Sequence, residues 1–143
     1  MLPEVVNWKT GGVLRSLGSL GLIKGDVNGL IQGAHSPNSV PAQVVFLVYV
    51  PEGVEITKYQ FLELHKHKDA REFRAVTGGV LHASGGVLPA DIIPFDFKKV
   101  APRTLEIVES LAPGEYGLLP PGATVSRNAS GTLGKMYTFR VIE

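Results

Sequence analysis

The sequence predicts an all-β protein, an antiparallel Greek-key β-sandwich. The 17 glycines and 10 prolines of this 143-residue chain interrupt it at short intervals, as turns do in an all-β sandwich or barrel. Between these interruptions, apolar residues alternate with polar ones or form short continuous runs, which indicates β-strands. Another kind of sandwich, or a jelly roll, is the alternative topology.

Composition and length indicate one globular domain over residues 1–143. Hydrophobic residues make up 44% of the chain and charged residues 19%, which is typical of a protein with a single core. The net charge of +1 predicts no general attraction to nucleic acid or to an anionic membrane. The chain has no cysteine, which excludes disulfides, thiolate metal ligands and cysteine nucleophiles.

The apolar segments are too short for a transmembrane helix. The longest run, residues 44–50, falls far below the roughly 20 residues needed to cross a bilayer. Residues 1–12 lack the pattern of a signal peptide. A location outside the cell or at the cell envelope is nevertheless expected, by association with the fold class.

Residues 1–35 form a glycine-rich N-terminal segment that is expected to contain a strand and a hairpin. Residues 22–24 and 30–32 would be the arms of the hairpin, and Asn28-Gly29 its turn. GDVNG, at residues 25–29, is similar to the start of a calcium loop, but apolar residues follow where further oxygen ligands are needed. We therefore interpret Asp26 and Asn28 as turn formers.

The stretch at residues 7–22 is apolar and is expected to be the first strand of the domain. The alternative is that this segment pairs with the sheet edge of a second copy and forms a homo-oligomer.

The middle of the chain contains the strongest strand signals. QVVFLVYV, at residues 43–50, is β-branched and aromatic, which predicts a central strand buried on both faces. Residues 58–67 alternate, so Leu62 and Leu64 should face the core. Core packing is also expected for the aromatic residues Phe46, Tyr49, Tyr59 and Phe61. Further strands are predicted at residues 72–77, 80–84, 94–100, 103–109, 115–119 and 135–142.

The sequence LAPGEY, at residues 111–116, resembles the tyrosine corner of fibronectin type III and other immunoglobulin-like domains. The resemblance covers residues 103–143 and implies that the sandwich is of the immunoglobulin-like kind. It implies that the Tyr116 hydroxyl bonds a backbone group a few residues upstream and that Leu111 packs inside. Antibody-type cysteines are absent, and Trp8 lies too early to be their core tryptophan. More loosely, the whole chain resembles bacterial β-sandwich proteins, a likeness that implies no particular activity.

ELHKHKD, at residues 63–69, is the candidate metal site. On a strand, Glu63, His65 and His67 share one face, with about 6.6–7 Å between successive members. Two neutral imidazoles and a carboxylate at this spacing can bind a divalent cation if another segment supplies a further ligand. The further ligands available are His82, His35, Asp91 and Asp96. The alternative is a solvated face that keeps an edge strand soluble.

Two arginines after the histidines are a second candidate for ligand binding. Arg71 and Arg74 could hold a carboxylate or a glycan, but an ion pair with Glu72 or a neighbouring strand is the preferred interpretation. Residues 126–134 are expected to form a polar loop between the last two strands, a position where binding specificity is often built. The sequence contains neither a GxSxG motif nor a phosphate-binding loop.

These observations predict a non-enzymatic binding or assembly module with a protein or glycan partner. The alternative is a metal-binding protein or metal-dependent hydrolase that uses His65 and His67, with Glu63 as ligand or base. No cofactor other than a divalent metal is expected, and neither a nucleic-acid partner nor a transmembrane segment is expected.

Overall fold

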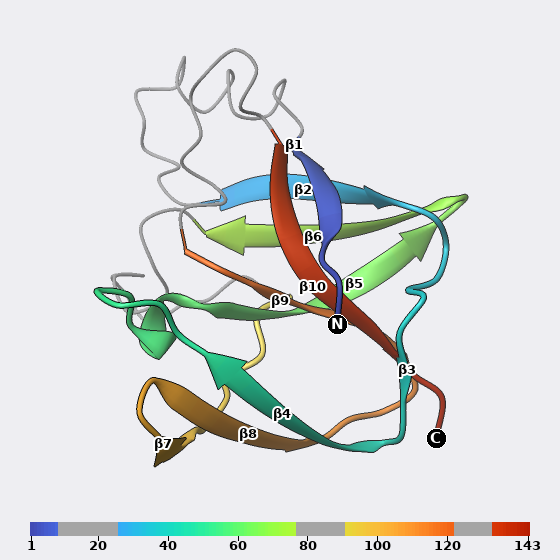
Figure 1. Ribbon diagram of the computed structural model, residues 1–143. Helices are drawn as coiled ribbons and strands as arrows, with labels where there is room; N and C mark the ends of the chain where they lie inside the picture. The colour runs from blue at the N-terminus through green and yellow to red at the C-terminus, as the bar shows by residue number, and fades with distance from the viewer. Residues whose placement is uncertain (9–25, 77–90, 122–132) are drawn as a thin grey trace.

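The computed structural model describes residues 1–8, 26–76, 91–121 and 133–143. Within these residues, the strands form two sheets, and a single 3₁₀ turn lies between two of the strands (Figure 1). The elements are β1 (Glu4–Trp8), β2 (Asp26–Gln32), β3 (Ser39–Val40), β4 (Gln43–Tyr49), η1 (Ile56–Lys58), β5 (Gln60–His67), β6 (Ala70–Val76), β7 (Lys98–Ala101), β8 (Thr104–Ser110), β9 (Gly114–Leu119) and β10 (Leu133–Val141). The predicted all-β class is confirmed. The strand pairs are antiparallel, apart from the parallel pair of β3 and β10.

Six strands of the larger sheet close into a barrel. Their order is β1-β2-β6-β5-β9-β10, and β1 pairs again with β10. The closing register runs from Glu4 opposite Met136 to Asn7 opposite Leu133. An immunoglobulin-like sandwich consists of two open sheets packed face to face. The predicted sandwich is therefore not confirmed, because the pairing of β1 with β10 removes the open edges of this sheet.

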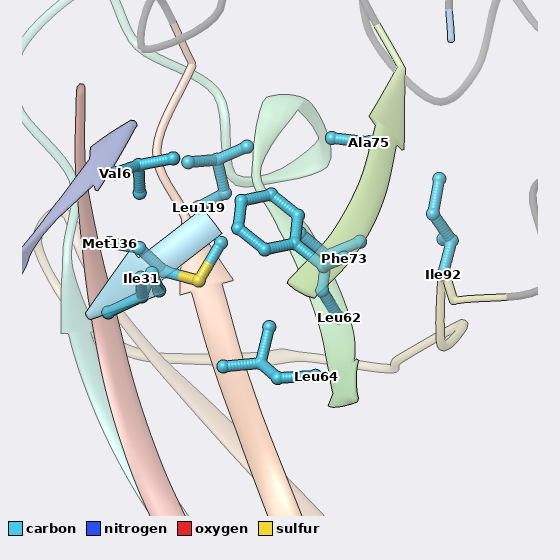
Figure 2. Close-up of a cluster of buried hydrophobic side chains, with 9 residues drawn as sticks. All are labelled: Val6, Ile31, Leu62, Leu64, Phe73, Ala75, Ile92, Leu119 and Met136. Carbon is cyan, nitrogen blue, oxygen red and sulfur yellow. The ribbon is translucent and has the colours of Figure 1, made fainter. Parts of the chain in front are cut away.

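The barrel interior holds the first hydrophobic core. Figure 2 shows nine buried side chains that come from all six barrel strands and from the segment after residue 90. They are Val6, Ile31, Leu62, Leu64, Phe73, Ala75, Ile92, Leu119 and Met136. Leu62 and Leu64 face this core, as the alternation of residues 58–67 predicts.

A second core lies between the barrel wall and the three-stranded sheet, which has the order β4-β8-β7. Its centre is aromatic: the ring of Phe139 lies 4.7 Å from that of Phe46 and 5.6 Å from that of Tyr116, between centroids. Phe61 completes this group, with its ring 5.9 Å from that of Phe139. Aromatic packing of this kind holds the small sheet against the barrel.

The predicted tyrosine corner is present at the start of β9. The Tyr116 hydroxyl donates a hydrogen bond to the carbonyl oxygen of Ala112, at 2.8 Å. Leu111 packs against the second core. The corner thus fixes the crossover from the small sheet, at the end of β8, into the barrel, at β9.

The predicted environment of residues 43–50 is wrong. β4 forms hydrogen bonds with β8 alone among the described strands, so it is an edge strand rather than a central one. Its side chains alternate between the second core and the surface. Val45, Leu47 and Tyr49 are 59%, 67% and 63% exposed, so the expected core position of Tyr49 is also wrong. The run is continuously apolar because the outer face of this strand carries apolar residues as well.

The predicted turn at Asn28-Gly29 is wrong. Residues 26–32 form one continuous strand, β2, between β1 and β6. Gly29 lies opposite Phe73, and a Cβ at Gly29 would overlap the Phe73 ring. The glycine makes room for an aromatic side chain in the barrel interior, and Asp26 and Asn28 are strand residues rather than turn formers.

The first strand, β1, includes the start of the apolar stretch predicted at residues 7–22, and the rest of that stretch lies outside the described residues. The arm predicted at residues 22–24 and the strand at 80–84 also lie outside them. Of the loop predicted at residues 126–134, residues 126–132 lie outside them, and the last two residues belong to β10 instead. The strand predicted at residues 94–100 is confirmed only at its end, by β7. Among the described residues, no helix has the length and apolar character that a membrane span requires.

Candidate functional site

The histidine row lies on the outer face of β5. Glu63, His65 and His67 are exposed and alternate with the buried Leu62 and Leu64, so the common face predicted for them is confirmed. β5 lies between β6 and β9. β9 pairs only with residues 60–64 of β5, however, so His65 and His67 lie where β5 pairs with β6 alone. The alternative of a solvated face that keeps an edge strand soluble is therefore supported for these two histidines.

Asp91 is the residue that meets this row. His65 Nε2 donates to Asp91 Oδ1 at 2.7 Å, and the second oxygen, Oδ2, accepts from the Arg74 backbone N–H at 2.8 Å. The Asp91 carbonyl oxygen accepts from the Glu63 backbone N–H at 2.8 Å. Asp91 therefore joins β5 to β6 through both its side chain and its backbone.

The predicted metal ligands do not assemble in the part of the chain that the structure describes. Residues 1–8, 26–76, 91–121 and 133–143 hold no group of three or more acidic or imidazole side chains that could bind one ion. His82 lies outside these ranges. His35 contacts a different carboxylate, Glu115.

A buried ion pair lies inside the barrel, at the inward-facing position of β6 next to Phe73. Arg71 is fully buried, and its Nη1 and Nη2 donate to the two carboxylate oxygens of Glu4 at 2.8 and 2.9 Å. Its Nε and Nη2 also donate to the carbonyl oxygens of Gly33 and Gln32, at 2.8 and 2.9 Å. The predicted ion pairing of Arg71 is confirmed, but its partner is Glu4 of β1, which is neither Glu72 nor a residue of an adjacent strand.

Thr138 and Ser36 extend this interior network. The Thr138 hydroxyl donates to Glu4 Oε2 and accepts from the Ser36 hydroxyl at 2.8 Å. Burial acts to raise the pKa of the Glu4 carboxyl, but the hydrogen bonds from Arg71 and Thr138 and the Arg71 charge outweigh it, so the pKa lies below its usual value. Glu4 is thereby held in its ionised form.

Glu115 forms the outer layer of the network. This buried carboxylate accepts from the Ser36 backbone N–H at 2.7 Å and from His35 Nδ1 at 3.0 Å. Two guanidinium groups lie slightly further away, with Arg140 Nε at 3.6 Å and Arg71 Nη1 at 3.8 Å. Several donors thus compensate the Glu115 charge.

An open pocket of about 460 Å³ lies at this mouth of the barrel. The register places Glu115 opposite both Leu64 and Arg140, and Lys66 opposite Arg71. These positions belong to the face of each strand that points into the barrel. The residues lining the pocket are His35, Leu64, His65, Lys66, Pro113, Gly114, Glu115, Arg140, Val141 and Ile142.

Three residues of this network were not predicted from the sequence: Glu4, Glu115 and Arg140. Their signal was the same alternation that located the core: Glu4 is two residues before the buried Val6, and Arg140 follows Met136 on the same strand face. A charged residue in step with core residues at a strand end is a candidate for a buried network or a barrel mouth.

A third surface feature is an apolar face on the three-stranded sheet, formed by Val45, Leu47 and Tyr49 of β4 and by Val108 of β8, which is 50% exposed. The Arg103 guanidinium lies over the Tyr49 ring, 5.8 Å from its centroid. Beside β4, a groove of about 290 Å³ separates the strand from the barrel wall. Its lining includes Phe46, Tyr59, Phe61, Leu118, Tyr137 and Phe139.

No family model matches this sequence, and no curated protein or solved structure is significantly similar to it. A function must therefore be inferred from the chemistry of the histidine row, the barrel mouth and the face beside β4.

Proposed function

We propose that the protein is a non-catalytic binding module that accepts an extended segment of a partner protein as an additional strand beside β4. The observation that carries this proposal is an uncharged edge strand with exposed apolar side chains and an aromatic groove next to it. The proposal includes the predicted likeness to immunoglobulin-like binding domains, which the corner at Tyr116 supports and the closed barrel does not.

The backbone of β4 offers hydrogen-bonding groups to a partner. Val50 N–H donates to the Arg103 carbonyl oxygen, and Leu111 N–H donates to the Ala42 carbonyl oxygen, so the even-numbered positions of β4 face β8. In an antiparallel ladder the intervening residues direct their N–H and C=O groups the other way. Gln43, Val45, Leu47 and Tyr49 thus present a ladder that an extended peptide can complete.

The two edges of the small sheet differ in their protection. β7, at one edge, carries the exposed Lys98 and Lys99, and charged residues of this kind discourage pairing with another strand. β4, at the other edge, has no charged residue between Gln43 and Tyr49. The asymmetry supports strand addition at the edge of β4.

The groove defines the chemistry of the partner. No charged side chain of the described residues lines it, and its walls include the rings of Phe46, Tyr59 and Tyr137. In an added strand, alternate side chains would point into this groove and the others would lie beside Leu47 on the outer face. The partner segment is therefore extended, with apolar residues at every second position.

A proline on β4 tests the proposal. Leu47→Pro removes a backbone N–H that points away from β8, so the pairing of β4 with β8 is kept, whereas an added strand loses a hydrogen bond and meets the ring. The probe is a phage-displayed library of random dodecapeptides. We expect selected peptides with alternating apolar residues that bind the wild type and the Leu47→Ala control but not Leu47→Pro.

Two results would count against this function. Equal binding of the selected peptides to Leu47→Pro would show that the edge of β4 is not used. A wild-type protein that dimerises in sedimentation, and a Leu47→Pro protein that does not, would assign the edge to a second copy of the chain and replace the partner peptide by self-assembly.

A further inference from the structure

We propose that the barrel mouth binds a small organic carboxylate, through Lys66 and Arg140 at its rim. This site lies on β5, β9 and β10, away from the edge of β4, and it is independent of the strand-addition proposal. The pocket volume of about 460 Å³ falls within the roughly 300–1,000 Å³ of small-molecule sites.

The two cationic side chains of the rim, Lys66 and Arg140, have hydrogen-bond donors available for a ligand. Within the described ranges, no hydrogen bond or ion pair involves the Lys66 ammonium, and Arg140 makes only the 3.6 Å contact from Nε to Glu115. The Arg140 side chain is 42% exposed, and its backbone is fixed because its N–H donates to the Asn38 carbonyl oxygen at 2.7 Å. The Arg140 backbone is thus anchored at the mouth, and the terminal guanidinium nitrogens, which form no hydrogen bond or ion pair with a described residue, are available to a planar anion.

The acidic group in the pocket, the Glu115 carboxylate, is not available to bind a cationic ligand. Glu115 is buried and accepts hydrogen bonds from Ser36 N–H and His35 Nδ1, with Arg71 behind it. Each of its oxygens already accepts a hydrogen bond from the protein, one from the buried backbone and one from the half-exposed His35, so the pocket offers donors at the rim and no unsatisfied acceptor at the floor. A pocket of this kind selects an anion rather than a cation.

The pocket wall favours an anion with an apolar part. Leu64, Pro113, Val141 and Ile142 line the pocket beside the two cations. A monocarboxylate with a short hydrocarbon chain matches both surfaces. A phosphate dianion brings a second negative charge toward Glu115 and has no group for the apolar wall.

Isothermal titration with sodium hexanoate at constant ionic strength tests this site, with neutral hexanamide and inorganic phosphate as comparison ligands. We expect hexanoate to bind more tightly than both. Arg140→Gln should weaken hexanoate binding about tenfold, the loss of one charge-assisted hydrogen-bond pair, and Lys66→Gln about threefold. The control Lys99→Gln changes an exposed lysine on β7 and should leave binding unchanged.

The two variants together separate a loss of binding from a loss of stability. Arg140→Gln removes a contact with Glu115, so its melting temperature is measured in parallel, whereas Lys66→Gln breaks no interaction within the described residues. Hexanoate affinity that stays at the wild-type value in both variants would overturn the proposal. Equal affinity for hexanamide would show that the anion is not recognised, and tighter binding of phosphate would show that the ligand class is wrong. Leu47→Pro should bind hexanoate like the wild type, which separates this site from the edge of β4.

Discussion

The guanidinium of Arg71 and the carboxylate of Glu4 form a two-pronged ion pair inside the barrel, with N–O distances of 2.8 and 2.9 Å. β1 and β6, which carry these residues, are not adjacent in the sheet, because β2 lies between them. The ion pair therefore crosses the barrel interior and links strands that share no backbone hydrogen bonds.

Removal of Arg71 is expected to be strongly destabilising. Arg71→Met leaves the carboxylates of Glu4 and Glu115 without their buried cation, and the loss of one partner of a buried pair costs about 3–5 kcal/mol. Urea denaturation gives the free energy of unfolding. The double variant Glu4→Gln/Arg71→Met should lose less than the two single variants added together. Additive losses would show that the two groups do not interact energetically.

The lowered pKa of Glu4 predicts a loss of stability in acid. A carboxyl whose pKa is lower in the folded than in the unfolded state stabilises the fold above its ordinary pKa, and this contribution falls as the pH drops from the ordinary value of 4.5 through the lower folded value. We expect the melting temperature of Glu4→Gln to depend less on pH below that value than that of the wild type. Parallel pH profiles would contradict the ion pair.

The tyrosine corner should contribute to the free energy of unfolding through the Tyr116 hydroxyl. Tyr116→Phe keeps the ring in the second core and removes the hydrogen bond to Ala112, so a loss of about 0.5–1.5 kcal/mol is expected in chemical denaturation. Tyr49→Phe is the matched control, since Tyr49 is largely exposed and its hydroxyl takes part in no hydrogen bond within the described residues. A corner that only fills space would give equal stabilities for the two variants.

Two barrel glycines should respond differently to alanine. A Cβ at Gly29 would overlap the rigid ring of Phe73, whereas a Cβ at Gly117 would meet the thioether of Met136. Met136 has flexible torsions and can move, so Gly29→Ala should cost more, about 1–3 kcal/mol. Thermal melting measures both variants. Rescue of Gly29→Ala by Phe73→Leu would confirm that the ring causes the loss.

Local patterns predicted the strands of the middle and end of the chain well. Alternation placed Leu62 and Leu64 inside and His65 outside, because the two-residue period of a strand is independent of its neighbours. The corner at Tyr116 was also predictable, since it depends on six consecutive residues. These features are set within a few residues of sequence.

The features that depend on distant segments were not predictable. The apolar run of β4 indicated a strand buried on both faces, and nothing in the run itself states that one face is exposed. Asn28-Gly29 has the sequence of a turn, and only the approach of Phe73 explains why Gly29 lies within a strand. The carboxylates of Glu4 and Glu115 acquire their roles from Arg71, which lies far from both in sequence.

Closure of the barrel by β1 and β10 has a consequence for synthesis on the ribosome. Of the six barrel strands, β1 is synthesised first, yet one of its two neighbours, β10, is synthesised after the other five. Until then Val6 and the side chains facing it stay in contact with water, and the ring of strands stays open. Closure of the barrel is thus delayed until β10 has left the exit tunnel, and chaperones can bind the open edges before then.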